Sequence, residues 1–227
     1  MLAITNHLAA QIRAALRGTG ADDSVRPGRG LLSLAFIATA SAMTYGAVMG
    51  SYGLINGGDP LQILYSAIKA PMLLLVTFAL TLPSFLVVNT LLGLRDDIAS
   101  VVHALLTAQT VVAIALLSLS PLTLFWYVSF KDYDPAILFN GLMFALASIG
   151  AQRPLRVRYA AFIRRNRRHA HMLKLWLVAY AFVGIQMGWV LRPFIGRQGM
   201  PVQFFRAEKW DNAYVIVARM IWRTIAG

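Results

Sequence analysis

The chain has no cysteine among its 227 residues, and only nine of them are acidic. The absence of cysteine excludes disulfides, thiolate metal sites and cysteine nucleophiles. Acid–base catalysis needs titratable side chains held in place. Beyond residue 30, however, every acidic residue lies between or after the long apolar stretches. These residues are Asp59, Asp96, Asp97, Asp132, Asp134, Glu208 and Asp211.

Sequence motifs that carry chemistry are also missing. There is no phosphate-binding glycine loop, serine nucleophile elbow or HExxH zinc motif. His169 and His171 are close in sequence, but a third metal ligand is missing and the neighbouring arginines repel a dication. The paired aspartates are more typical of helix caps than of a divalent-ion site. We therefore expect no catalytic residue, no cofactor and no metal.

Long uncharged stretches dominate the sequence. Hydrophobic residues make up 58% and charged residues 13% of the chain, whereas a soluble domain has about a quarter charged residues. A helix needs about 20 apolar residues to cross the hydrocarbon core of a bilayer. The expected spans are 31–56, 70–94, 98–119, 135–152 and 173–191. The sequence therefore predicts an all-α polytopic membrane bundle of about five transmembrane helices, with amphipathic helices at both ends.

This pattern divides the chain into three parts. Residues 1–30 are expected to form a cytoplasmic amphipathic helix and a linker, because apolar residues recur every four positions near the N-terminus. Residues 31–196 form the five-span transmembrane domain, which includes a basic cytoplasmic loop over 153–172. Residues 197–227 form an interfacial tail with a short, largely apolar helix.

A row of small residues marks one face of the first span. Its members repeat at four-residue spacing and are Ala38, Ala42, Gly46 and Gly50. Small residues allow two helix backbones to approach closely in lipid. The row predicts helix packing, either within the chain or, as the less favoured alternative, at a homodimer seam.

A few polar residues interrupt the apolar spans. They are Asn89, His103, Gln109, Asn140 and Gln186. Such residues either line a polar pathway or form hydrogen bonds between helices. We favour hydrogen bonds for the amides and a position near the headgroups for His103, which lies shortly after Asp97.

Positive charge is concentrated in one segment of the chain. The net charge is +12, and residues 153–174 carry eight cations and no acid. Basic segments stay cytoplasmic, so we expect a cytoplasmic N-terminus. An odd number of spans then places the C-terminal tail outside, although it is also basic. Contacts with anionic lipid headgroups or a protein partner are expected at Arg164, Arg165, Arg167 and Arg168, and nucleic-acid binding is not expected.

Three short sequence segments, called phrases below, resemble those of a family of bacterial inner-membrane proteins that lacks a settled function. They are Lys69-Ala70-Pro71, which marks the entry to the second span, Pro83-Ser84 with Asn89 and Leu91-Leu92-Gly93-Leu94, and Trp189-x-x-Arg192-Pro193-Phe194. The five-span plan with its N-terminus inside is also similar to the Yip family of membrane proteins. The resemblance implies the bacterial inner membrane. It supplies no substrate, cofactor or catalytic residue.

These observations predict a non-catalytic protein. We expect an integral membrane scaffold or an accessory subunit of a membrane complex, with a protein partner or a second copy of itself. The alternative is a small transporter or channel component that uses the polar residues within the spans.

Overall fold

The computed structural model of the chain describes residues 2–17, 27–196, 199–200, 202–205, 215, 219 and 222. The described part is all-α and contains no strand. Its elements are α1 (Leu2–Arg17), α2 (Pro27–Ile55), α3 (Leu61–Leu91), η1 (Arg95–Asp97), α4 (Ile98–Ser129), α5 (Tyr133–Arg165) and α6 (Arg168–Val190). The linker after α1 and most of the expected interfacial tail, residues 197–227, lie outside the described residues.

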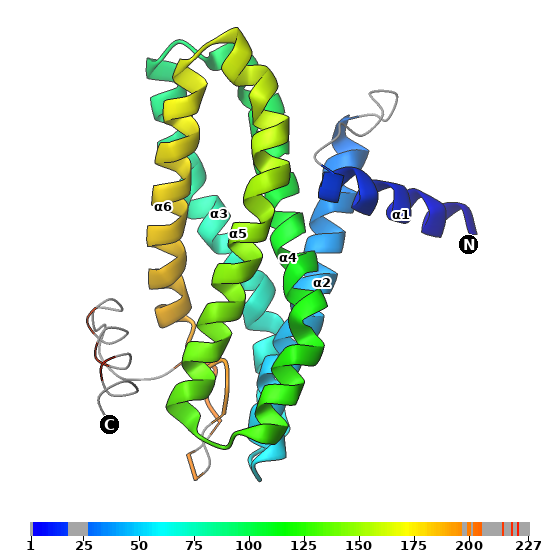
Figure 1. Cartoon of the computed structure of the whole chain (residues 1–227), viewed down its shortest axis with the longest axis vertical. Helices are drawn as coiled ribbons and strands as arrows, with labels where there is room; N and C mark the ends of the chain where they lie inside the picture. The colour runs from blue at the N-terminus through cyan, green and yellow to red at the C-terminus, as the bar shows by residue number, and fades with distance from the viewer. Residues whose placement is uncertain are drawn as a thin grey trace.

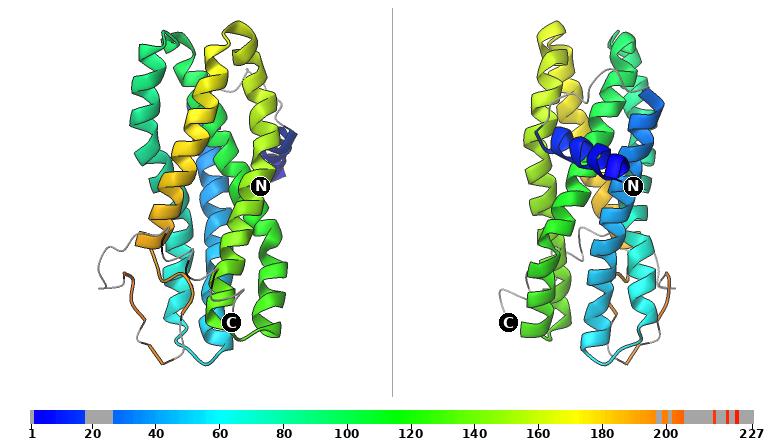
Figure 2. Two further views of the ribbon diagram at one scale, coloured as in Figure 1. Left: turned by 60° about the vertical axis from the view of Figure 1, so that its left-hand side comes forward. Right: turned by 90° about the vertical axis from the view of Figure 1, so that its right-hand side faces the viewer.

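Five of these helices are long and apolar enough to cross a membrane, namely α2 to α6. They run up and down along one common axis, whereas α1 lies across that axis on the flank of the bundle (Figures 1 and 2). The predicted class, an all-α polytopic membrane bundle of five spans, is confirmed.

The helices are longer than the apolar stretches that revealed them. Helix α3 begins at Leu61, nine residues before the expected start of the second span. Helix α4 continues through Pro121 to Ser129, ten residues past 119, where the third span was expected to end. Proline removes one backbone hydrogen bond and tends to bend a helix, but membrane helices tolerate it because neighbouring groups satisfy the freed carbonyl.

Residues 153–172 differ from the expected basic loop, because they are helical. Helix α5 runs to Arg165 and α6 begins at Arg168, which leaves Asn166 and Arg167 as the whole connection. Arginine and alanine, which dominate this segment, are good helix formers. The change from apolar to charged residues therefore marks the boundary of the membrane and not the end of a helix.

Helices α2 and α3 approach each other closely at two glycines of α2. A Cβ atom added to Gly46 would lie 2.3 Å from the Ser66 carbonyl oxygen, and one added to Gly50 would lie 2.6 Å from the Ile63 Cα. Side chains of any size are excluded at both positions. Ala38 and Ala42, on the same row, are buried in the core. Helix α2 also packs along α4, α4 along α5, and α3 along α6.

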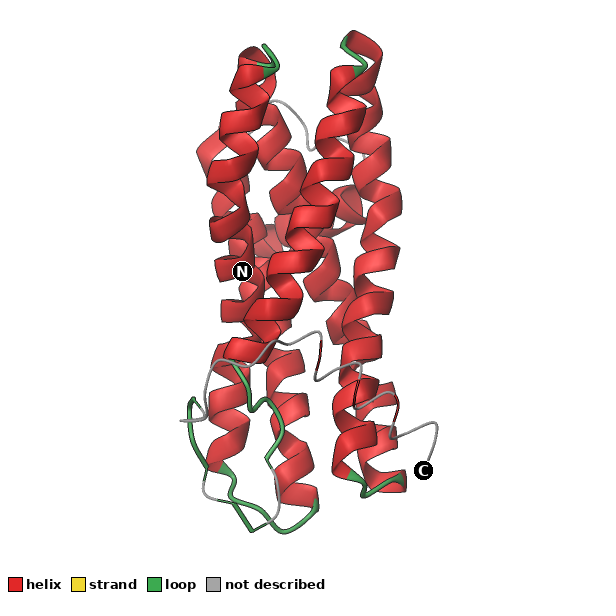
Figure 3. Cartoon of the chain, turned by 90° about the vertical axis from the view of Figure 1, so that its left-hand side faces the viewer, coloured by secondary structure: helices red, strands yellow, loops and turns green. Residues whose placement is uncertain are grey.

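The buried side chains form two separate clusters. The larger, which we call the main core, joins α2, α4 and α5 around residues such as Tyr45, Leu116 and Met143. The smaller, which we call the end core, includes Phe85, Val101, Leu105, Tyr159 and Trp176. It lies near the α3–α4 and α5–α6 turns, which are at the same end of the bundle (Figure 1) and form the two loops at the upper end of Figure 3. That end therefore has a packed interior of its own.

The α2–α3 contact leads to a first prediction. Replacing Gly46 and Gly50 with leucine forces side chains into the backbone of α3, so we expect a loss of about 3 kcal/mol or more in the free energy of unfolding. Thermal unfolding in mild detergent measures it. Gly141→Leu and Gly150→Leu are the matched controls, because a Cβ atom at either position meets nothing within 4 Å. Equal stability of the two double variants would contradict the close approach.

Candidate functional site at the basic end of the bundle

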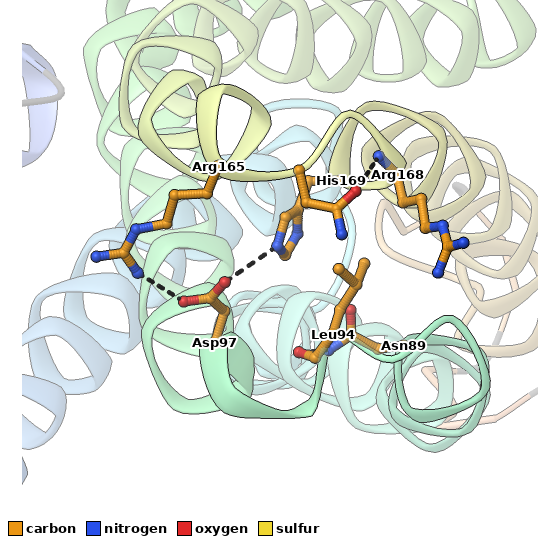
Figure 4. A network of polar contacts seen from close by, with 7 residues as sticks. Asn89, Leu94, Asp97, Arg165, Arg168 and His169 are labelled. Carbon is orange, nitrogen blue, oxygen red and sulfur yellow. Dashed lines mark hydrogen bonds and ion pairs between the residues drawn. The ribbon is translucent and has the colours of Figure 1, made fainter.

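A polar network joins the two turns at the basic end. Asp97 ends η1, Arg165 ends α5, and His169 lies in the first turn of α6. The Asp97 carboxylate accepts a hydrogen bond from Arg165 Nη1 at 3.0 Å, and its other oxygen lies 3.2 Å from His169 Nε2. Figure 4 shows the carboxylate between the two side chains. One acidic residue thus ties the α3–α4 turn to the α5–α6 turn.

The imidazole of His169 is completely buried. Its ring packs near the rings of Tyr159 and Phe162, with centroids 6.0 and 5.6 Å away. The His169 Nδ1 atom and the Tyr159 hydroxyl have no hydrogen-bond partner among the described residues. His171, two positions later, is exposed, so the two histidines do not face a common point. Within the described part of the chain no group of three metal-ligating side chains occurs.

Main-chain carbonyls of the α3–α4 turn accept further hydrogen bonds. Arg168 Nη1 donates to the Leu92 carbonyl at 2.9 Å, and Asn89 Nδ2 donates to the Leu94 carbonyl at 3.1 Å. The Asn166 side chain accepts a hydrogen bond from the Arg168 backbone N–H at 3.0 Å, which forms an Asx turn just before α6. Sequence reasoning missed Asn166, although asparagine often forms such a turn. Together these bonds hold the end of the bundle in one arrangement.

The four arginines expected to contact lipid or a partner fall into two pairs. Arg165 and Arg168 are bound to the α3–α4 turn by the contacts just described. Arg164 and Arg167 are exposed and interact with no described residue. The order of charges in the sequence does not reveal this division. It depends on which side of the α5–α6 hairpin each arginine side chain points toward. The cations available to another molecule are therefore fewer than the sequence suggests.

The polar residues expected in the spans are not gathered along one path. Asn140 accepts from the Tyr45 hydroxyl at 3.3 Å and donates to the Tyr127 hydroxyl at 2.6 Å. Gln109 accepts from the Tyr180 hydroxyl at 2.7 Å. Asn89 is bound to the α3–α4 turn, and His103 and Gln186 are partly buried. The tyrosines were missed as partners, although a buried tyrosine hydroxyl usually has one.

A second polar site holds the segment that follows α6. Lys69 is completely buried, and its Nζ donates to the Pro193 carbonyl at 2.8 Å. Gln62 Nε2 donates to the carbonyls of Pro193 and Phe194 at 3.1 and 3.2 Å. The Ser66 hydroxyl also donates to the Phe194 carbonyl. We call residues 191–196 the strap.

Two of the phrases that carry the family resemblance therefore meet in space. Lys69, which opens one phrase, contacts Pro193 near the end of another. Two side chains of the strap are buried, with Leu191 at 2% and Ile195 at 3% exposure, and the other four residues are partly exposed. Three donors on one face of α3 thus hold the backbone carbonyls of the strap.

The fold and these sites define an integral membrane helical bundle. Comparisons with family models, with curated proteins and with solved structures found no match for the chain.

The basic-end network predicts unequal effects for its members. Arg165 is 73% exposed, so Arg165→Gln is expected to cost about 1 kcal/mol or less. His169→Ala removes a buried ring and is expected to cost about 2 kcal/mol or more. Unfolding in detergent, followed by tryptophan fluorescence, compares them. Arg164→Gln, which breaks no contact, is the control. A larger effect of Arg165→Gln than of His169→Ala would contradict the packing described above.

The strap is tested by labelling, since the chain has no native cysteine. A cysteine at Ile195 is expected to react slowly with a maleimide. Adding Gln62→Leu and Ser66→Ala removes three of the hydrogen bonds that hold the strap. Labelling at position 195 is then expected to accelerate about tenfold or more. A cysteine at the exposed Met200 is the control and keeps its rate. An unchanged rate at position 195 would show that the α3 donors do not hold the strap.

Proposed function

We propose that the chain is a non-catalytic membrane scaffold or accessory subunit of the bacterial inner membrane. One observation carries the proposal, namely a basic end of the five-span bundle whose two turns are joined by polar contacts. Its arginines lie on helices that are fixed by the end core and by the Asp97 network. Rigid, charged helix ends suit the recognition of another protein better than they suit the chemistry of a small molecule.

The distribution of charge supports a cytoplasmic N-terminus. Helix α1, the α3–α4 turn and the α5–α6 turn lie toward the same end of the bundle (Figure 1). That end carries the eight cations of residues 153–174 and Arg95 with Asp96 and Asp97, whereas the opposite end carries Lys131 and Arg192 with Asp59, Asp132 and Asp134. The positive-inside rule places the first end in the cytoplasm. The strap then lies toward the other side of the membrane.

The hydrogen bonds within the spans favour a scaffold over a transporter. Asn140 and Gln109 are bonded to tyrosines of other helices. Substrate pathways use polar groups that are free to bind the substrate. A small transporter or channel component remains the alternative, and it requires these amides to exchange partners during transport.

Orientation is checked with single cysteines in intact cells. A cysteine at Arg167 is expected to resist a membrane-impermeant maleimide until the membrane is permeabilised. A cysteine at Lys131 is expected to react from outside, because the two exposed positions lie at opposite ends of α5. The reverse pattern would overturn the proposed orientation.

The scaffold role is checked by crosslinking. A photo-reactive residue at Ala161, exposed on the projecting part of α5, is expected to yield a discrete adduct with another protein. Leu142, exposed on the same helix in the apolar span, is the control position and is expected to yield lipid adducts. Absence of a protein adduct at every exposed position of the basic end would contradict the proposal.

A further inference from the structure

The cations of α5 do not lie at one depth. Asp134 and Arg153 bracket an uncharged stretch of α5, and its length matches the hydrocarbon core at about 1.5 Å per residue. Arg164 follows Arg153 by eleven residues, which amounts to about 16 Å along the helix axis. The headgroup layer adds only about 5 to 8 Å on each side of the core. The α5–α6 turn therefore extends past the headgroups.

Helix α1 gives a second, independent mark of the membrane surface. It lies across the bundle axis, as an amphipathic helix in the interface does, and both turns of the basic end extend beyond it (Figure 1). Arg158 Nη2 donates to the Ala14 carbonyl near the end of α1 at 3.3 Å. Arg164 lies six residues beyond Arg158, or about 9 Å further along α5. Both marks place the turn outside the headgroup layer.

The two groups of cations are therefore suited to different molecules. Arg153 and Arg156 are exposed beside the membrane surface, where anionic headgroups are within reach. Arg164 and Arg167 lie about one Debye length or more beyond it, where attraction to the lipid is largely screened. Residues 95–97 and 164–168 together carry five arginines and two aspartates, a net charge of +3. Asp97 is already bound to Arg165 and His169.

We propose that Arg164 and Arg167 bind an acidic segment of a soluble protein, while Arg153 and Arg156 bind the headgroups of the chain's own membrane. The inference rests on the proposed scaffold function and names the chemistry of its partner. A guanidinium group binds a carboxylate through two parallel hydrogen bonds. The fixed turn holds both side chains outside the lipid, ready for that contact. Nucleic acid fits the turn less well, because no exposed aromatic residue of the described part of the chain lies beside Arg164 and Arg167 for base stacking.

The experiment compares two variants that lose the same charge. Wild type, Arg164→Gln/Arg167→Gln and Arg153→Gln/Arg156→Gln are placed in phosphatidylcholine nanodiscs at physiological salt. Binding of fluorescein-labelled poly-L-glutamate is then measured. The first variant is expected to bind about tenfold more weakly than wild type, and the second within about twofold. A second readout follows spin-labelled phosphatidylglycerol in mixed nanodiscs, and there only the second variant is expected to lose contact with the lipid.

Several results would overturn the inference. In the polymer assay they are a wild type that does not bind poly-L-glutamate, or equal weakening of binding by both variants. In the lipid assay it is loss of phosphatidylglycerol contact in the Arg164/Arg167 variant. Tighter binding of a single-stranded oligonucleotide than of the polymer would also overturn it. Failure here is distinct from failure of the scaffold function. If the Ala161 crosslink to another protein persists in the Arg164/Arg167 variant, the scaffold stands and the partner uses another surface.

Discussion

The contact between α2 and α3 sets the positions of the other helices. The backbone of α3 touches α2 at Ser66 and beside Gln62, where Gly46 and Gly50 leave room for it. The side chains of the same two residues bind the strap. Helix α2 also packs against α4, and α3 packs against α6. A bulkier residue at Gly46 or Gly50 would therefore shift the donors of the strap site as well as the helix pair.

The absence of water in the hydrocarbon core explains the polar contacts between the spans. A buried amide or hydroxyl must find its partner within the protein there. Asn140 meets this requirement with two tyrosines from other helices, and Gln109 with one. Each such bond contributes only about 0.6 kcal/mol on average. Their value lies in specifying which helix faces which, because an apolar surface alone allows many rotations.

The class of fold was predictable because the length of each apolar stretch can be counted directly along the sequence. The position of Gly46 and Gly50 against another helix follows the same logic, since four-residue spacing defines one face. The helical state of residues 153–165 was not predictable from charge, which marks the membrane boundary and not the helix end. The division of the arginines and the contact of Lys69 with Pro193 depend on how distant segments meet. No local pattern encodes that arrangement.

The strap also imposes an order of events during synthesis. Lys69 and its partner Pro193 are 124 residues apart in the chain. At about 5 to 20 residues per second, the lysine is made some 6 to 25 s before the carbonyl that receives it. During that interval its ammonium group has no strap to bind, so water or lipid headgroups must solvate it. The donors of α3 therefore meet their carbonyl partners only after α6 has been made.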